Sequence, residues 1–435
     1  MKLASFLIAA CATAVLAATA SAQTKLTIAT VNNGDMIRMQ KLTDDFKAKN
    51  PGIDLEWVTL EENVLRQKVT TDIATKGGQY DVLTIGTYEV PIWAKQDWLV
   101  PLTGLGAGYD VDDLLPPIRA GLTVDGKLYA APFYGESSMI MYRKDLFEAA
   151  GLKMPDKPNW DFIKSAAAKI TDKSKEIYGI CLRGKPGWGE NMAFLTATSN
   201  SFGARWFDEK WTPQFNTPEW KATLDYYLAL LKADGPPGAA SNGFNENLAL
   251  FNSGKCGMWI DATVAASFVT GKDSKVADHV GFALAPDNGL GKRGNWLWAW
   301  SLAIPAGSQK TEAAEKFVNW ATSKHYTELV ASKEGWPNVP PGTRKSLYAN
   351  PEYSKVPFAQ KTLDSINSAD PTHPTVKPVP YVGVQFVAIP EFAGIATEVG
   401  QDFSAALAGT ITGDEALAKA QASTEAAMKK AGYIK

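Results

Sequence analysis

The stretch KLTIATVNNGDMIRMQKLTDDFKAKNPGIDLEWVTL, residues Lys25–Leu60, holds two apolar segments with a helical pattern between them. KLTIATV, residues 25–31, is a short apolar run with the β-branched residues typical of a buried strand. From residue 35 to residue 50, apolar side chains recur at the spacing of one helix face. Asn50-Pro51-Gly52 should stop that helix, and IDLEWVTL, residues 53–60, should form the next strand. The stretch therefore predicts a strand–helix–strand unit.

The chain continues with the same alternation. Asn63 can cap a helix VLRQKVTTDIATK, Gly77-Gly78 should end it, and YDVLTIG reads as the third strand. Strands that alternate with helices indicate an α/β fold with a parallel sheet. Ligands of such sheets bind at the carboxyl ends of the strands. The polar residues that follow the three strands are Asn32, Asn33, Glu61, Glu62, Thr87, Tyr88 and Glu89.

A second α/β region begins near Gly135. Its runs EIYGICL and KCGMWI carry Cys181 and Cys256, and both runs are expected to be strands of one sheet. In an oxidising compartment two cysteines can form a disulfide, but the sequence leaves open whether these two are bridged. Farther along, Thr311–Glu334 has the pattern of one long amphipathic helix.

The first 22 residues, MKLASFLIAACATAVLAATASA, have the features of a secretory signal peptide. Lys2 precedes an apolar run, and Ala20-Ser21-Ala22 is a cleavage pattern that makes Gln23 the first mature residue. The alternative is a lipoprotein signal that ends at Cys11, which would leave a shorter apolar region. No later apolar run reaches the roughly 20 residues needed to cross a bilayer. We therefore expect a soluble protein exported to the periplasm.

Charge and composition exclude several classes of function. The chain has 44 Lys and Arg residues against 46 Asp and Glu residues, and it has no basic run, which argues against nucleic acid as a partner. His279, His325 and His373 are scattered, without metal-ligand spacing. The sequence contains no Walker loop, dinucleotide fingerprint or nucleophile elbow. We expect no metal, no cofactor and no catalytic residue.

Three tryptophans alternate in GNWLWAWS, residues 294–301. In a strand, Trp296, Trp298 and Trp300 share one face, which either packs into a core or forms a platform for a ligand with apolar faces. Trp188 and Trp336 lie in loops rich in Gly and Pro, where a core role is harder to supply.

Isolated carboxylates accompany these indoles. Glu136 stands between two apolar stretches, and Asp261 follows the run KCGMWI. A carboxylate can accept hydrogen bonds from two neighbouring hydroxyl groups while indole faces cover the C–H faces of the same molecule. This combination favours a sugar or a sugar alcohol as the ligand.

The stretch APFYGESSMIMYRKDLFEAAGL with the following NWDFIKSAAAKI resembles the family 1 extracellular solute-binding proteins, the maltose-binding-protein group of ABC importers. LFNSGKCGMWIDATVAAS and the tail GTITGDEALAKAQ are also similar to segments of that family, so the resemblance spans essentially the whole mature chain. TIGTYEVPIWAKQDWLVPL and RGKPGWGENMAF further resemble the branch that binds sorbitol and mannitol.

The resemblance implies a type II periplasmic-binding-protein fold, with two α/β lobes, three crossings between them and a ligand in the cleft. The crossings map near Phe133–Gly135, Asn295–Ala299 and Glu334–Val339. Residues 23–134 with 296–336 would form the N-terminal lobe, and residues 135–295 with 337–435 the C-terminal lobe. The tryptophan row then runs through the cleft, where Trp296 and Trp298 wall the ligand and Trp300 is turned away into a core.

The resemblance and the strand ends together give the candidate ligand-binding set. It comprises Asn33, Glu61, Thr87, Tyr88, Glu89, Glu136, Trp188, Asp261, Trp296, Trp298, Trp336 and Gln385. The family's maltose binders carry an aromatic residue where this chain has Val264, which favours a small, single-unit ligand.

The implied function is the periplasmic component of an ABC importer. It would bind a sugar alcohol or monosaccharide as a monomer and deliver it to a membrane permease. Two alternatives stay open on the residues alone. One is a secreted glycoside hydrolase, whose acid and base would come from Glu136, Asp261 and Glu89. The other is a binder of quaternary amines, which would use the tryptophans as a cation–π cage.

Overall fold

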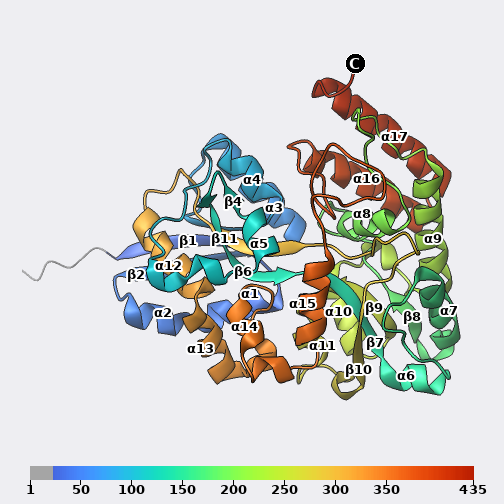
Figure 1. The fold of residues 1–435 in the computed structure, drawn as a ribbon, viewed down its shortest axis with the longest axis horizontal. Coiled ribbons are helices and arrows are strands. Elements are labelled where there is room, and N and C mark those ends of the chain that lie inside the picture. Colours follow the sequence, from blue (N-terminus) through green and yellow to red (C-terminus); the bar gives the residue numbers. More distant parts are fainter. Residues whose placement is uncertain (1–22) are drawn as a thin grey trace, which may run out of the picture.

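The computed structural model describes residues 23–435, so the predicted signal peptide, residues 1–22, lies outside the described residues. The chain folds into two α/β lobes, each built around its own sheet (Figure 1). Among residues 23–435, no helix combines the length and apolar character that a membrane span requires.

The first sheet has the strand order β2-β1-β3-β11-β6. Its strands are β1 (Thr24–Val31), β2 (Ile53–Leu60), β3 (Val82–Ile85), β6 (Ala130–Glu136) and β11 (Trp298–Ala303). β1 pairs in parallel with β2 and with β3, as the sequence predicts, whereas β11 is antiparallel to β3 and to β6. A small hairpin joins β4 (Thr123–Val124) to β5 (Lys127–Leu128).

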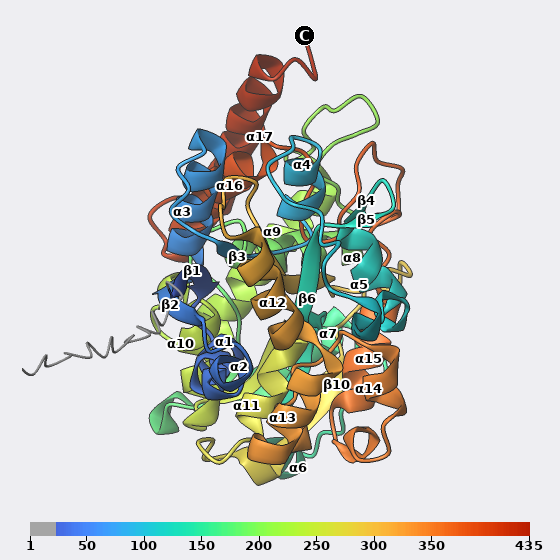
Figure 2. The same ribbon diagram turned by 90° about the vertical axis from the view of Figure 1, so that its left-hand side faces the viewer.

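Helices cover both sides of the first sheet, with α3 and α4 above it and α1, α2 and α13 below it in Figures 1 and 2. The helices of this lobe are α1 (Gly34–Lys41), α2 (Thr43–Lys49), α3 (Glu62–Thr75), α4 (Glu89–Ala94), α5 (Pro116–Gly121), α12 (Thr311–Thr322) and α13 (Lys324–Glu334). α14 (Lys345–Ala349) is tied to the same lobe, since the backbone N–H of Ser346 donates to Asp113.

The second sheet has the strand order β10-β7-β9-β8. Its strands are β7 (Ser138–Arg143), β8 (Tyr178–Cys181), β9 (Cys256–Ala262) and β10 (Val280–Leu284). The helices of this lobe are α6 (Lys144–Ala149), α7 (Trp160–Ile170), α8 (Asn191–Ser201), α9 (Pro218–Asp234), α10 (Phe244–Asn252), α11 (Ala266–Val269), α15 (Ala359–Ser368), α16 (Phe392–Leu407) and α17 (Gly413–Lys430).

The lobes are joined where strands run from one sheet into the other. β6 of the first sheet passes through Ser137 directly into β7 of the second sheet. The chain returns through Asn295, whose side-chain amide donates to the Ser137 hydroxyl and to the Ser365 carbonyl. The Gly135 N–H of β6 donates to the Pro341 carbonyl, and a Cβ atom on Gly135 or Gly342 would overlap the other residue's carbonyl, so these two segments of the first lobe touch through backbone alone. The third passage between the lobes lies farther on, between α14 of the first lobe and α15 of the second.

Three helix boundaries differ from the sequence prediction. The predicted helix 35–50 is two helices that meet at Leu42, and the predicted helix 311–334 breaks at Ser323. Ser323 has extended backbone and its hydroxyl accepts from the Tyr326 N–H, so it starts a new helix. The cap of α3 is Glu61 rather than Asn63, because the Glu61 carboxylate accepts from the N–H groups of Asn63 and Val64.

Cys181 and Cys256 are bridged by a disulfide. They lie on β8 and β9, which pair in parallel, and their Cα atoms are 5.8 Å apart. Both side chains are buried. The two cysteines are thus neighbours in one sheet, as expected from their strand-like runs, and the bridge answers the question that the sequence left open.

Removing this disulfide should destabilise the folded chain. The bridge closes a loop between residues 75 positions apart, for which the chain-entropy model gives about 4 kcal/mol. Reducing agent should therefore lower the melting temperature of the wild type and leave that of a Cys181→Ala/Cys256→Ala variant unchanged. Equal responses of the two proteins in scanning calorimetry would contradict this stabilising role.

Candidate ligand-binding cleft

A cavity lies between the two lobes and has walls from both. Water-sized molecules have about 70 Å³ available inside it. On the first lobe its walls include the residues that directly follow β1 and β2, as the strand-end argument predicts. The lining residues on which the following description depends are Asn33, Glu61, Glu62, Arg66, Tyr134, Glu136, Arg183, Lys185, Trp188, Glu190, Val264, Trp296, Trp298, Trp300 and Gln385.

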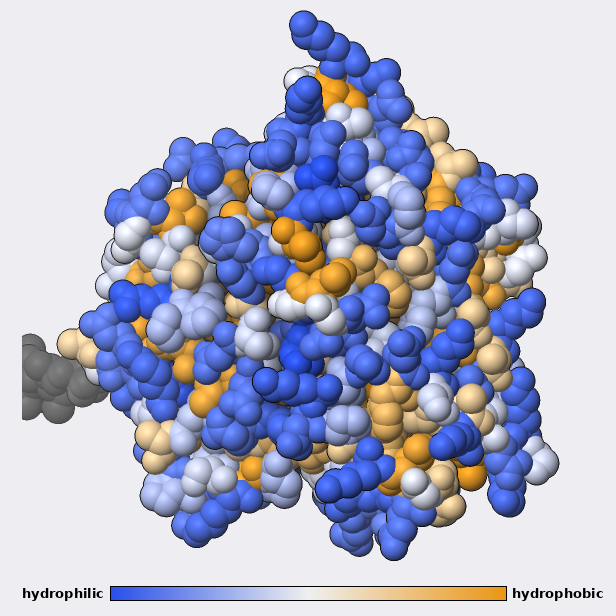
Figure 3. Space-filling view, turned by 45° about the vertical axis from the view of Figure 1, so that its right-hand side comes forward, coloured by the Kyte–Doolittle hydropathy of each residue, from blue (hydrophilic) through white to orange (hydrophobic). Residues whose placement is uncertain are grey.

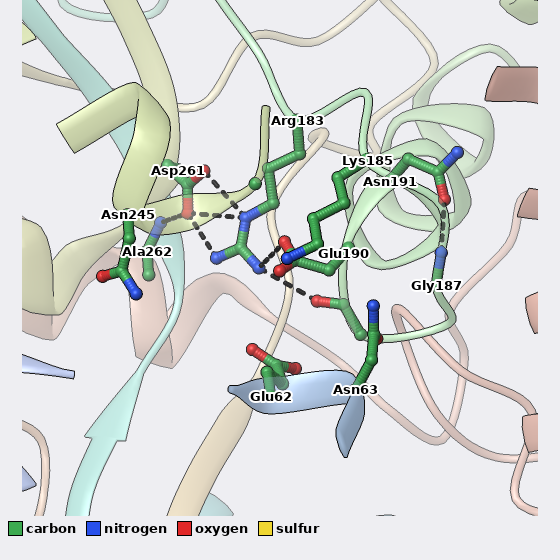
Figure 4. A network of polar contacts seen from close by, with 12 residues as sticks. Glu62, Asn63, Arg183, Lys185, Gly187, Glu190, Asn191, Asn245, Asp261 and Ala262 are labelled. Carbon is green, nitrogen blue, oxygen red and sulfur yellow. Dashed lines mark hydrogen bonds and ion pairs between the residues drawn. The ribbon is translucent and has the colours of Figure 1, made fainter. Parts of the chain in front are cut away.

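The polar centre of the second-lobe wall is the buried guanidinium of Arg183, which follows β8 (Figure 4). Its Nη2 donates to Asp261 Oδ1 at 2.6 Å and its Nε to Asp261 Oδ2 at 2.9 Å. Nη1 donates to the Gly189 carbonyl at 2.9 Å and to Glu190 Oε2 at 3.3 Å. Glu62 of α3 faces this network from the other lobe (Figure 4). Because its charge is paired and its N–H groups are bonded, Arg183 can be buried in the wall.

A second buried guanidinium, that of Arg66 on α3, is held by two carboxylates. Arg66 Nη1 donates to Glu89 at 2.7 Å and Nη2 donates to Glu62 at 2.8 Å. Its remaining surroundings are indole rings, with ring centres 3.9 Å away for Trp188, 4.7 Å for Trp300 and 5.0 Å for Trp298. These distances are in the range of cation–π attraction. The aromatic cage of this cleft is therefore filled by the protein's own arginine.

The tryptophan row has all three indoles on the cavity. Trp298 and Trp300 pack edge to face with ring centres 5.5 Å apart, and Trp296 lies 5.6 Å from the Arg183 guanidinium. Trp300 was expected to turn away into a core; it is buried among core residues, but it also lines the cavity. The strand β11 runs regularly from Trp298 to Trp300, and its pairing with β6 shifts only after Trp300, so nothing rotates this indole away.

Glu136, at the end of β6, pairs in register with Trp298 of β11. Within residues 23–435, neither Glu136 Oε2 nor Trp298 Nε1 has a hydrogen-bond partner, although both atoms are buried. Burial, together with the nearby carboxylates of Asp261 and Glu62, raises the pKa of Glu136 to about 8, against the opposing effect of the Arg183 charge. An acceptor and a donor without partners thus belong to two paired residues of the cavity lining.

Seven residues of the candidate set line the cavity. They are Asn33, Glu61, Glu136, Trp188, Trp296, Trp298 and Gln385. Glu61 forms an ion pair of 2.7 Å with Lys185 across the cleft, while the amide of Asn33 donates to the Tyr134 hydroxyl. Gln385 accepts from the Leu297 N–H and donates to the Leu297 carbonyl, which fixes the second crossing.

The other five members of the candidate set are absent from this lining: Thr87, Tyr88, Glu89, Asp261 and Trp336. Asp261 and Glu89 are buried beside the two arginines, where they compensate the guanidinium charges of Arg183 and Arg66. The Tyr88 hydroxyl donates to the Ile389 carbonyl and accepts from the Ala393 N–H, so it ties the lobes together beside Trp188. Thr87 is buried, and Trp336 is partly buried at the start of a single turn after α13.

Several lining residues were not in the predicted set, above all Arg66, Arg183, Lys185 and Glu190. Arg66 stands four residues after Glu62 on α3, a spacing that predicts an ion pair on one helix face. Arg183 and Lys185 come directly after a predicted strand, in CLRGKPGWGEN, so the rule of strand ends could have included them.

Two α/β lobes joined by several crossings, with a cavity of paired charges and indole faces between them, define a binding protein that encloses a small solute. Residues 33–328 match the model of the family described as "Bacterial extracellular solute-binding protein", and the chain belongs to that family.

Its relatives include binders of sugar alcohols. The chain is 59% identical over 411 residues to the mannitol-binding protein of Pseudomonas aeruginosa, covering 94% of each chain. It is 78% identical to a solute-binding protein of Agrobacterium vitis S4 whose crystal structure holds D-mannitol, with a TM-score of 0.94, 94% of this chain covered and 100% of that one. A solute-binding protein of Agrobacterium radiobacter K84 in complex with ribitol is 27% identical, with a TM-score of 0.81, 93% of this chain covered and 98% of that one.

The raised pKa of Glu136 should make the protein less stable as the pH rises. A carboxyl group whose pKa is higher in the folded than in the unfolded chain stabilises the fold at low pH. For Glu136 this contribution is complete below about pH 4.5 and is lost as the pH rises through about 8. The free energy of unfolding without ligand should therefore fall between pH 5 and pH 8. Glu136→Gln should reduce that fall by at least about 1.4 kcal/mol, the value of one pKa unit.

Asp35→Asn is a matched control for this measurement by urea denaturation. Asp35 is also a buried carboxyl group, and burial raises its pKa to about 6. Its substitution should therefore flatten the profile only below about pH 6. A Glu136→Gln profile parallel to that of the wild type between pH 6 and pH 8 would show that Glu136 does not titrate as described.

Proposed function

We propose that this chain is the periplasmic substrate-binding component of an ABC importer that binds a linear sugar alcohol of the mannitol type and delivers it to a membrane permease. The D-mannitol complex of the relative that is 78% identical supports this ligand class. In this proposal residues 23–134 with 296–336 and residues 135–295 with 337–435 act as the two clamping lobes, except that the first lobe also holds the segment of the last range up to α14. The protein binds its ligand as a monomer and is not an enzyme.

The observation that most supports this proposal is that two buried atoms of the described chain, Glu136 Oε2 and Trp298 Nε1, have no hydrogen-bond partner. A hydroxyl group both donates and accepts hydrogen bonds, so the hydroxyl groups of a sugar alcohol can satisfy both kinds of atom. A buried polar atom without a partner costs about 1–3 kcal/mol, which a bound hydroxyl removes. The indole faces of Trp296 and Trp298 provide the apolar wall for the carbon chain of the same molecule.

The size of the cavity supports a single small unit. A single water molecule needs at least about 10–15 Å³ of cavity volume. The 70 Å³ available here therefore fits a few waters or one compact polyol. Val264 lines the cavity at the position where the resemblance places an aromatic residue in maltose binders. A long oligosaccharide does not suit these dimensions.

The two alternative functions find less support in the same geometry. The hydrolase would need two carboxylates that face the substrate, but Asp261 is bonded to Arg183 and Glu89 to Arg66. The quaternary-amine binder would need an open aromatic cage, and Arg66 fills the one that Trp188, Trp298 and Trp300 form.

The remaining parts of the proposal concern export and assembly. Export to the periplasm fits the family described as extracellular and the predicted signal peptide before Gln23. A monomer fits the face shown in Figure 3, where hydrophobic residues are interspersed with hydrophilic ones.

D-mannitol should raise the melting temperature of the purified mature chain, whereas maltose and glycine betaine should not. Ligand at 100 times its Kd stabilises a protein by about 2.7 kcal/mol, a shift that calorimetry detects readily. The same screen with sorbitol, ribitol and D-mannose would show how the stabilisation depends on the configuration, the chain length and the ring closure of the ligand. Stabilisation by maltose or betaine without stabilisation by any sugar alcohol would overturn the proposed ligand class.

Trp188→Ala should weaken D-mannitol binding about 10- to 100-fold, because an indole face on the cavity and the cover over Arg66 are lost together. Trp336→Ala is the matched control, since Trp336 is a loop tryptophan outside the lining, and its affinity should stay within about twofold of the wild type. Titration calorimetry, corrected for the folded fraction, decides. An equal loss of affinity in both variants would mean that the effect of the substitution does not depend on whether the tryptophan lines the cavity.

A further inference from the structure

The walls of the cleft carry more acidic than basic groups. Each buried cation already has its partners, with Arg66 held by Glu62 and Glu89, and Arg183 held by Asp261 and Glu190. The third cation, Lys185, pairs with Glu61. Glu246 also lines the cavity, and its carboxylate accepts the Gly243 N–H at the start of α10.

Among the buried carboxyl groups of this lining, Glu136 is the one left without a cation. Its side chain is only 5% exposed, it lines the cavity, and within residues 23–435 it makes no ion pair. The charged groups that face it are Arg183, Asp261 and Glu62, and Arg183 is committed to Asp261 at 2.6 Å. Its Oε2 has no partner of either kind in the part of the chain that the structure describes. A donor with a positive charge would therefore find an acceptor that the protein itself does not use.

We infer that the cleft also accepts a polyol in which a primary ammonium group replaces one terminal hydroxyl, and that Glu136 binds this ammonium. The inference rests on the proposed function, because the carbon chain and the other hydroxyl groups are held as in a sugar alcohol. An ammonium has three N–H donors and nearly the volume of a hydroxyl group, so the substitution needs no additional space. The neighbouring hydroxyl then accepts from Trp298 Nε1, which an ammonium cannot do.

The same charge balance excludes two related kinds of ligand. A polyol with a terminal carboxylate would place its negative charge beside Glu62, in a wall with more acidic than basic groups, and it could form no ion pair with Glu136 in either protonation state of that residue. A trimethylammonium group has no N–H to donate, and Arg66 occupies the aromatic cage that would otherwise receive it.

Binding of the amine should be linked to proton release. Because burial raises the pKa of Glu136 to about 8, this carboxyl group is largely protonated at pH 7. A bound ammonium favours the ionised carboxylate and lowers that pKa, so a proton leaves as the ion pair forms. D-mannitol brings no charge, and its binding should release fewer protons.

The test is titration calorimetry at pH 7 with D-mannitol, 1-amino-1-deoxy-D-mannitol and D-mannonate, in two buffers of different ionisation enthalpy. We expect the amine to bind at least as tightly as D-mannitol, with proton release visible as a buffer-dependent enthalpy. D-mannonate should bind at least 100-fold more weakly than the amine.

Variants assign the effect to Glu136. Glu136→Gln should reduce the affinity for the amine at least tenfold more than the affinity for D-mannitol, because only the amine loses an ion pair. Asp35→Asn, a buried carboxyl outside the lining, should leave the ratio of the two affinities unchanged.

The outcomes separate this inference from the proposed function. D-mannitol binding without binding of the amine would overturn the inference and leave the proposed function standing. Failure of both ligands would overturn the proposed function and the inference with it. Binding of the amine with an unchanged ratio in Glu136→Gln would show that another group receives the ammonium, which also overturns the inference. The comparison of the three ligands on the wild type holds even if the Glu136→Gln protein does not fold.

Discussion

The guanidinium of Arg66 is the interaction on which the cleft depends. Glu62 and Glu89 of the first lobe hold it by charge, and Trp188 of the second lobe covers it together with Trp298 and Trp300 of the second crossing. A buried arginine is tolerated only when its charge is compensated and its N–H groups are hydrogen-bonded. The two carboxylates compensate the charge of Arg66, and the indoles shield the same guanidinium from solvent. The indoles of Trp188, Trp298 and Trp300 therefore pack around an arginine that the ion pairs with Glu62 and Glu89 hold in place.

The second arginine explains why Glu136 differs from the other carboxyl groups. Arg183 takes Asp261 and Glu190 as partners, just as Arg66 takes Glu62 and Glu89. In the cleft, the carboxylates of Asp261, Glu190, Glu62 and Glu89 are therefore compensated by an arginine, and the carboxyl group of Glu136 is not. This difference is the reason why we propose Glu136, and not the other four, as the carboxyl group that contacts the solute.

The sequence predicted the strands well, because short apolar runs bounded by turn residues require no knowledge of distant partners. β2 has the predicted bounds, and β1 and β3 fall within one or two residues of their predicted runs. The helix breaks at Leu42 and Ser323 were missed, since the apolar spacing continues across both; a side-chain cap marks the break at Ser323, and no side-chain cap marks the one at Leu42.

The candidate site was predictable where it depends on strand ends and on loop tryptophans, as for Asn33, Glu61 and Trp188. It was not predictable for Asp261 and Glu89, whose carboxylates pair with arginines that are 78 and 23 residues away in the chain. A sequence shows that a carboxylate follows a strand. Whether that carboxylate contacts a bound solute or forms an ion pair with an arginine depends on side chains from segments far away in the sequence.

The contact between Gly135 and Gly342 has a mechanical consequence. The end of β6, which leads through Ser137 into the second lobe, meets the Pro341–Gly342 segment there with no side chain between them, and the Gly135 N–H donates to the Pro341 carbonyl at 2.9 Å. The Gly342 N–H in turn donates to the Tyr348 hydroxyl of α14, so the segment is anchored on the first lobe. A side chain at either glycine would push these segments apart and displace the strand that leads into the second lobe.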